Sequence, residues 1–584
     1  MRRMVILAAS FVVLVVACTS SSGDTTTTAG LQPQATTTAP VVSTTVAPVT
    51  TTTEAPDGFG GGVTIGVDFP SETLNPFSPD AFGIHMYGNL VWATVYDIDP
   101  DTWDRIPDVI EAMPSKSDGI TVNDDGTMTV MYKIVDQAMW SDGEPITGAD
   151  LALTAEAMRD MAVAGEGGVD PVMATVIGTE ADSKSASITF SEPTLAFEDA
   201  LWIILPSHAL EGVDLVDGTD GTEWPSGGPF VLEGEANFDE LRFVRNENYW
   251  KSVDGRALPY LDAVTILATT EPGSQGDEPV SPIGAFVAHV VDVAPIPPVP
   301  LEYDHIESAV TEGAEFHYVP TPIIEHLTFN FSDARFETNP DSVNEFIDFR
   351  RALAASINRP QILDETGVAW FPETPGMLIP VGESVWSVYE VGIAQIPELP
   401  EGATSTLGTT CEGDSRYRIK DALEPAFTAA GVMYEPECLD SSVFFGETIV
   451  EGTYDIGMWA WVSDGGYASQ LRVLELFDPR SVPPEEGFFD GGNYGRWGSG
   501  GTANNSTVRF SEIVDEAKAT LDPVAFFDLV REAEAILATE LPIIPLSSRG
   551  SGLAIWPDAV TGVTANGSRS TFTWNIELWQ RPGK

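Results

Sequence analysis

Cationic residues are scarce in this sequence, and the shortage limits the partners that the protein can have. The 584 residues include 28 Lys and Arg against 88 Asp and Glu, a formal net charge of −60. A nucleic-acid partner requires a basic surface that displaces counterions, and anionic lipid attracts clustered Lys and Arg. We therefore expect no nucleic-acid partner and no direct electrostatic binding to a membrane. The 43% of hydrophobic residues can bury a large core, so the chain is not a disordered acidic polymer.

Cysteine, histidine and the common catalytic motifs are also scarce or absent. The three cysteines form no C-x-x-C pair, which argues against a zinc ribbon or a thioredoxin-like site. The six histidines lack metal-ligand spacing, and there is no G-x-S-x-G, G-x-x-x-x-G-K-(S/T), G-x-G-x-x-G or H-E-x-x-H. We therefore predict no catalytic residue, no cofactor and no metal site, and we expect no enzyme. A cluster of distant histidines brought together by folding, for nickel among other metals, stays open as an alternative.

The first residues predict export. An apolar run at 5–17, broken by one serine, follows two arginines and ends at Cys18. Thirteen residues are too few for a membrane-spanning helix, which needs about 20. The sequence V-V-A-C at the end of the run resembles the bacterial lipobox, which implies that residues 1–17 are a lipoprotein signal peptide and that Cys18 carries lipid; an ordinary signal peptide cut nearby is the alternative. We thus expect an extracytoplasmic protein, in the periplasm or at the cell surface, held to the bacterial cell membrane through lipid only.

Residues 18–57 predict a disordered tether. Between 19 and 56 there are 14 Thr and 4 Pro with almost no large apolar side chain, so burial cannot offset the entropy of ordering this segment. As a flexible coil it would span about 35 Å on average, and about 120 Å if drawn out as polyproline II. Such a tether lets a folded body stand away from a membrane and reorient.

Cys411 and Cys438 are the two cysteines that remain. In an exported protein such a pair is most simply a disulfide. The bridge would close a loop of 28 residues, which the chain-entropy account values at about 3 to 4 kcal/mol.

The body of the chain alternates short β-branched or aromatic runs with amphipathic stretches, which indicates an α/β fold. Residues 127–134 alternate apolar and polar side chains after an Asp-Gly turn, which predicts a strand. Residues 147–150 (T-G-A-D) are typical of a capping box, and the apolar spacing after them predicts a helix over 151–162. The same helical spacing occurs at 346–357 and at 526–537.

Several short segments occur in the order found in one known family. The most distinctive is M-W-S-D-G-E-P-I-T-G-A-D at 139–150; the others lie at 74–77, 118–134, 205–208, 227–230, 245–250, 349–359, 454–456 and 541–546. In this order they resemble the extracellular solute-binding proteins of peptide and nickel ABC importers, family five. Gly148, Gly227 and Asn358 depart from the usual residues, and none of the three occupies a known binding position.

The resemblance implies an α/β two-lobed clamp of the periplasmic-binding-protein type II, in its large three-subdomain variety with mixed sheets. Lobe I would comprise 58–320 with 546–584, and lobe II would comprise 321–545. The chain would cross between them near 317–327 and 541–549, where extended apolar segments with prolines suit hinge strands. The expected ligand is a small molecule, most simply an oligopeptide, which would close the monomeric clamp when it binds. The clamp would then deliver this ligand to an ABC permease and ATPase complex. Oligosaccharides, nickel chelates and other solutes stay open as ligands.

The same resemblance marks candidate ligand contacts. Asp464 stands where an acidic residue pairs with the amino terminus of a peptide; the alternative is a turn-forming residue before two glycines. Arg496 would bind a ligand carboxylate through two hydrogen bonds. The other candidates are alternatively core or rim residues; they are Trp461, Tyr494, Trp497, Tyr87 and His85.

Two functions of other classes stay open. A secreted hydrolase would need a nucleophile and base that the sequence does not show, and measured turnover would favour it. A surface receptor or adhesin would use the same clamp without a transporter. Reversible binding without turnover would favour the transport-linked protein.

Overall fold

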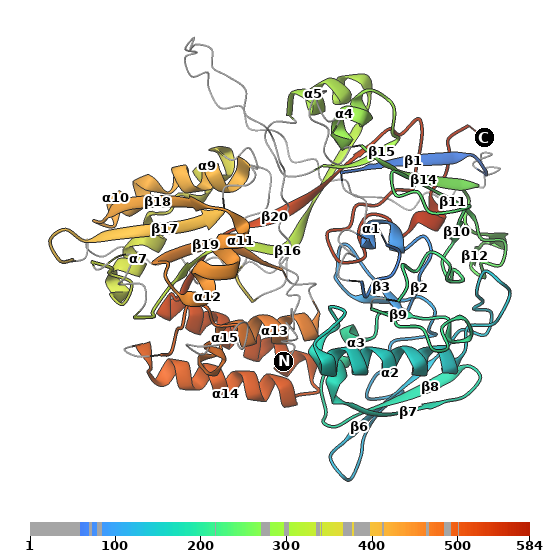
Figure 1. Ribbon diagram of the computed structural model, residues 1–584, viewed down its shortest axis with the longest axis horizontal. Helices are drawn as coiled ribbons and strands as arrows, with labels where there is room; N and C mark the ends of the chain where they lie inside the picture. Colours follow the sequence, from blue (N-terminus) through green and yellow to red (C-terminus); the bar gives the residue numbers. More distant parts are fainter. Residues whose placement is uncertain are drawn as a thin grey trace, which may run out of the picture.

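The computed structural model is a mixed α/β molecule with two lobes (Figure 1). It describes residues 59–68, 73–78, 84–216, 218–269, 281–296, 303–333, 339, 341–365, 376–378, 398–410, 414–462, 466–483, 492–499 and 502–583. The predicted signal peptide and tether, Asp464 and Cys411 lie outside these residues. Cys438 is disulfide-bonded. Within the described residues, no helix combines the length and the apolar character needed to cross a membrane.

A ten-stranded mixed sheet runs through both lobes. Its strands, in spatial order, are β10 (Phe230–Leu232), β11 (Glu240–Arg245), β14 (Ala263–Ala268), β1 (Gly62–Val67), β15 (Val293–Ile296), β20 (Ile543–Ile555), β16 (Glu315–Phe329), β19 (Ile456–Val462), β17 (Thr404–Thr410) and β18 (Met433–Leu439). At one end β1 pairs parallel with β14 and β15, and at the other β17 pairs parallel with β18 and β19. The antiparallel strands β16 and β20 join these two ends, so the predicted mixed sheet is confirmed.

The two longest strands carry the chain from one lobe to the other. One end of β20 pairs with β15, one end of β16 pairs with β19, and the two strands pair with each other between these ends. The 15 residues of β16 extend about 50 Å at about 3.3 Å per residue. Their register shifts between Pro320 and Ile324 and again between Glu325 and His326. Such irregularities bend a ladder and increase its twist, which suits a connection between two bodies.

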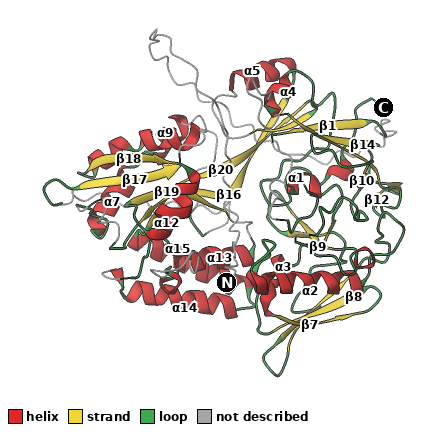
Figure 2. Ribbon diagram, viewed as in Figure 1, coloured by secondary structure: helices red, strands yellow, loops and turns green. Residues whose placement is uncertain are grey.

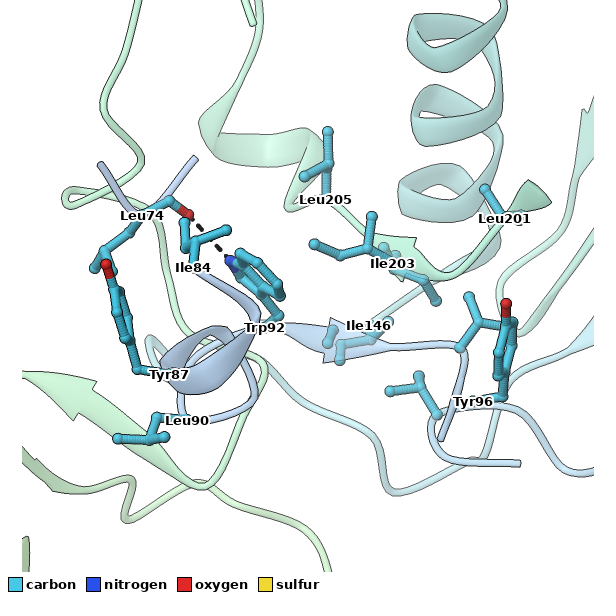
Figure 3. Close-up of a cluster of buried hydrophobic side chains, with 14 of the residues drawn as sticks. Leu74, Ile84, Tyr87, Leu90, Trp92, Tyr96, Ile146, Leu201, Ile203 and Leu205 are labelled. Carbon is cyan, nitrogen blue, oxygen red and sulfur yellow. Dashed lines mark hydrogen bonds between the residues drawn. The ribbon is translucent and has the colours of Figure 1, made fainter. Parts of the chain in front are cut away.

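Each lobe has its own hydrophobic core. We call lobe I the half whose core is built from the first half of the chain and the last residues, and lobe II the half whose core is built mainly from residues 324 to 546. The exact boundaries proposed from the sequence stay a prediction, because β16 and β20 belong to both halves. The lobe I core includes the buried group around Tyr87 and Trp92 that Figure 3 shows, in which Trp92 Nε1 donates to Leu74 O at 3.0 Å.

Lobe I carries a small sheet and helix beside the large sheet. Its other elements are α1 (His85–Gly88), β2 (Ala93–Thr94), β3 (Tyr96–Ile98), β4 (Arg105–Pro107), β5 (Ile120–Val122), β6 (Met128–Lys133), α2 (Gly148–Ala164), β7 (Val176–Ala181), β8 (Ser185–Phe190), α3 (Phe197–Ala200), β9 (Ile203–Ile204), β12 (Ser252–Val253), β13 (Arg256–Ala257), α4 (Pro282–Val287) and α5 (Tyr303–Glu312). The predicted strand at 127–134 is β6, which buries alternate residues. The predicted capping box is present at the start of α2, where Thr147 N donates to Asp150 Oδ2 at 2.7 Å.

Lobe II covers its strands with helices. They are α7 (Ile347–Ser356), α8 (Arg359–Glu365), α9 (Asp414–Ala422), α10 (Glu424–Ala429), α11 (Ser441–Val443), α12 (Ile449–Glu451), α13 (Tyr467–Phe477), α14 (Asn505–Ala519) and α15 (Pro523–Glu540). In Figure 1 and Figure 2, α9 lies beside β17 and β18, and Figure 1 shows α10 next to β18. The predicted helix at 526–537 lies within α15, whose apolar face is buried. The helix predicted at 346–357 is α7; Phe346 precedes it as the N-cap residue and is 41% exposed.

Candidate functional site

The two lobes touch through α3 of lobe I and the start of α13 of lobe II. Asp199 Oδ2 accepts a hydrogen bond from the backbone N–H of Ala468 at 2.9 Å, and its other carboxylate oxygen pairs with Arg105. The Asp199 and Arg105 side chains are only 5% and 10% exposed. The N-cap residue of α13 is Gly466, which has no side chain to cap the helix. A carboxylate from lobe I therefore satisfies the positive end of a lobe II helix.

Buried and half-buried side chains flank this ion pair. Leu195 and Ala196 of lobe I are part of the lobe II core. Burial and the charge of Asp199 raise the pKa of Glu198 to about 7, although Arg105 opposes them. Burial likewise raises the pKa of Tyr467 to about 12. The lobes thus exclude water where they meet, which strengthens the electrostatic interactions there.

Lobe I presents an aromatic group beside this contact. The rings of His85, Trp92 and Trp202 lie with centroids 5.1 to 5.5 Å apart. The guanidinium of Arg569 lies 5.1 Å from the centroid of the Trp202 ring. The predicted contact His85 belongs to this group, whereas the predicted contact Tyr87 is fully buried in the lobe I core. We call His85, Trp92, Trp202 and Arg569 the lobe I wall.

Lobe II presents a second aromatic group, around Trp461 at the end of β19. The Trp461 ring stacks on Tyr494, with centroids 6.2 Å apart, and on His326 at 6.4 Å. Burial lowers the pKa of His326 to about 4, so this histidine is neutral at pH 7. A cavity of about 10 Å³ lies between Trp461, Tyr494 and Thr328, which is room for about one water molecule. We call Trp461 and Tyr494 the lobe II wall.

Two further predicted contacts have internal partners. Arg496 donates from Nη1 to Tyr494 O at 2.9 Å and from Nη2 to Val450 O at 2.8 Å, so its guanidinium binds backbone carbonyls. Trp497 is 1% exposed and packs edge-on against Phe510, with centroids 5.4 Å apart. In this conformation both side chains hold lobe II together. Asp464 lies outside the described residues, between Val462 at the end of β19 and Gly466 at the start of α13.

Several residues of this region could not be predicted from local sequence patterns. Arg105 and Asp199 are 94 residues apart in the chain and meet only in the folded structure. Trp202 and Arg569 lie in no motif. Neither residue was predicted as a contact from the sequence. Among the described residues, no group of three or more His, Cys, Asp or Glu side chains is arranged to hold a metal ion.

Comparison with known proteins agrees with this geometry. Residues 106–384 match the model of the bacterial extracellular solute-binding proteins, family 5 (middle). This match spans 279 of the 584 residues, just under half of the chain. The oligopeptide-binding protein OppA of Mycobacterium tuberculosis (strain H37Rv) is 23% identical to it over 467 residues, which cover 73% of this chain and 70% of OppA.

Two solved structures show the same fold as this chain. The periplasmic EDTA-binding protein EppA matches with a TM-score of 0.70 at 17% identity, over 92% of this chain and all of EppA. AppA of Bacillus subtilis, in complex with a nonapeptide, matches with a TM-score of 0.59 at 16% identity, over 90% of this chain and all of AppA. The chain therefore has the two-lobed fold of these binding proteins, and its similarity to the family model and to OppA supports a solute-binding protein of the ABC-transporter type.

Proposed function

We propose that this chain binds an oligopeptide between its lobes and delivers it to an ABC importer when the lobes close. The observation that carries the proposal is the pair of crossing strands β16 and β20, which join two separately packed lobes that meet again at α3 and α13. A ligand that contacts both lobes stabilises the closed form by its difference in affinity for the two forms. The half-buried rings of the two walls, His85, Trp202 and Trp461, offer the apolar surface for such a ligand.

The choice of a peptide rests on the relatives. OppA is named an oligopeptide-binding protein, and AppA holds a nonapeptide. Strand edges at a cleft bind the peptide main chain with little regard to sequence, and Asp464 would pair with the free amino terminus. In this proposal Cys18 carries the lipid that keeps the monomeric protein at the outer side of the membrane, next to its permease.

The experiment is a thermal-shift screen of the full chain with peptides of two to eight residues, amino acids, oligosaccharides and nickel chelates. A peptide at 100 times its dissociation constant should stabilise the protein by about 2.7 kcal/mol. Binding of peptides without turnover supports the proposal. Hydrolysis of the peptides, or stabilisation by the other solutes alone, would contradict it.

Two variants separate the finer parts of the proposal. Asp464→Asn should weaken a peptide with a free amine far more than its acetylated form, whereas Asp558→Asn, at an exposed position, should change neither. Equal losses for both peptide forms would remove Asp464 from this role. Cys18→Ser should move the protein from the membrane fraction to the soluble fraction without changing peptide affinity; retention in the membrane would contradict the lipid anchor.

A further inference from the structure

A charged cluster lies where the chain crosses between the lobes. Glu325 of β16 is 2% exposed. Its Oε1 accepts from Arg416 Nε of α9 at 2.6 Å, and its Oε2 accepts from Arg549 Nε and Nη2 of β20 at 3.1 and 2.8 Å. One buried carboxylate is therefore shared by two guanidinium groups, and we call these three residues the hinge cluster.

The hinge cluster carries one unmatched positive charge. Burial alone would raise the pKa of Glu325, but Arg416 and Arg549 lower it to about 2, so this carboxylate is ionised. Burial and the charge of Arg549 lower the pKa of Arg416 in spite of Glu325. Among the described residues, neither arginine forms an ion pair with a second carboxylate. The adjacent His326 is neutral and adds no charge.

One nitrogen of the Arg549 guanidinium is not used in the hinge cluster. Its Nε and Nη2 groups point to Glu325, whereas its Nη1 group makes no hydrogen bond to any described residue. Its side chain is 21% exposed, compared with 9% for Arg416. The backbone of Arg549 is fixed because its carbonyl accepts from Thr321 Oγ1 at 2.6 Å. The free donor is thus held in place before any ligand arrives, which lowers the entropy lost on binding.

The charge of the whole chain makes this position unusual. With a net charge of −60, the surface as a whole repels anions. Arg549 is partly exposed, so its excess positive charge can meet an anion, and the buried surroundings of Glu325 strengthen that attraction relative to bulk water. The sequence suggested Arg496 as the partner of a ligand carboxylate. In the structure, its guanidinium donates to two backbone carbonyls instead. Arg549 has both the free donor and the unmatched charge.

We propose that Arg549, oriented by Glu325 and Arg416, binds a carboxylate group of the transported solute at the crossing between the lobes. The inference rests on the proposed function and makes it more specific: the ligand carries a free carboxylate, and this group contacts the strands that join the lobes. Closure around such a ligand then involves β16 and β20 themselves.

The test measures carboxylate preference by calorimetry in the full chain. The first probe is the tightest peptide from the thermal-shift screen, as the free acid and as the C-terminal amide; the second probe is succinate. Loss of a charge-assisted hydrogen bond should weaken the free acid about ten- to hundredfold in Arg549→Gln and leave the amide nearly unchanged. Arg242→Gln, in an exposed pair with Glu233, is the control and should bind both forms as the parent does.

The outcomes separate this inference from the proposed function. If peptides bind and Arg549→Gln has the same affinities as the parent for the free acid and for the amide, the hinge cluster is not the carboxylate site. The peptide proposal then stands. If no peptide binds but succinate stabilises the parent and not Arg549→Gln, the carboxylate site stands and the peptide proposal fails. If neither probe distinguishes the parent from Arg549→Gln, the inference is overturned. Arg549→Gln leaves Glu325 paired one-to-one with Arg416, so we expect it to fold.

Discussion

Replacing Asp199 by Asn should open the clamp. Asp199 belongs to lobe I, and its carboxylate binds Arg105 of its own lobe and the Ala468 N–H of lobe II. Asparagine keeps the shape and one acceptor oxygen but removes the negative charge. The guanidinium of Arg105 is buried, and its Nε has no hydrogen-bond partner among the described residues. It then loses the carboxylate that is hydrogen-bonded to it.

The expected size follows from burial. Breaking a buried ion pair by removing one partner destabilises a protein by about 3 to 5 kcal/mol. Since opening exposes Arg105 to water, we expect this penalty to fall on the closed form alone and take the lower limit of about 3 kcal/mol. Each 1.4 kcal/mol is a factor of ten, so the ratio of closed to open molecules should fall about 100-fold. Ligand affinity falls in proportion to the competent fraction.

The assay is small-angle scattering with and without the screened peptide, together with calorimetry of peptide binding. Asp199→Asn should show a larger radius of gyration without ligand and weaker binding. The matched control is Asp118→Asn, which breaks the pair with Lys133 at side-chain exposures of 70% and 43%, where an ion pair contributes about 0 to 1 kcal/mol. An Asp199→Asn protein that melts earlier but keeps its radius and its affinity would show that the contact does not control closure.

Three other perturbations test the same structure. Burial and Asp199 raise the pKa of Glu198 to about 7, so the stability that Glu198 contributes to the contact is fully present below about pH 4.5 and is lost as pH rises through about 7. Glu198→Gln should therefore make the closed fraction, measured by scattering, depend less on pH between pH 5 and 8. A pH dependence equal to that of the parent would refute this. A Cβ at Gly466 would collide with Arg105 and Asp199, so Gly466→Ala should lower the closed fraction; unaltered scattering would mean that the contact adapts. Burial and a neighbouring carboxylate raise the pKa of Asp97, so its share of stability is lost as pH rises. Asp97→Asn should therefore raise the melting temperature more at pH 8 than at pH 4, and calorimetry that finds an equal change would contradict this.

Local patterns predicted the parts of the fold that depend on neighbours in the sequence. The capping box formed at α2 because Thr147 and Asp150 need only each other and the helix backbone. The apolar spacing at 526–537 placed α15 because a helix buries residues three and four apart on one face. The prolines and extended residues near 317–327 and 541–549 coincide with β16 and β20.

The candidate site depends on tertiary contacts that sequence spacing does not encode. The sequence predicted that Arg496 contacts the ligand. Its backbone is left-handed, with φ of 56°, and its side chain is held by backbone carbonyls of lobe II. Arg549 lay inside a segment predicted only as a hinge strand. Glu325 lies 224 residues before it in the chain, so their pairing appears only when β16 and β20 are paired. Asp199 and Ala468 meet across 269 residues in the same way.

Three of the cations of this chain, Arg105, Arg416 and Arg549, lie beside buried carboxylates. With 28 Lys and Arg among 88 acidic residues, surface ion pairs cannot neutralise the protein, and each would contribute little. Arg105 is buried at the contact between the lobes, and Arg416 and Arg549 hold Glu325 at the crossing strands. At the contact, one guanidinium faces Glu198 and Asp199, and at the crossing two guanidiniums face one carboxylate. Where the lobes meet, carboxylates outnumber guanidiniums, so closure should weaken as pH rises. At the crossing, guanidiniums outnumber carboxylates, which leaves a positive charge that an anion can bind. If Arg549 binds the solute as we propose, the clamp should close most tightly around a ligand whose carboxylate supplies the missing negative charge at the hinge.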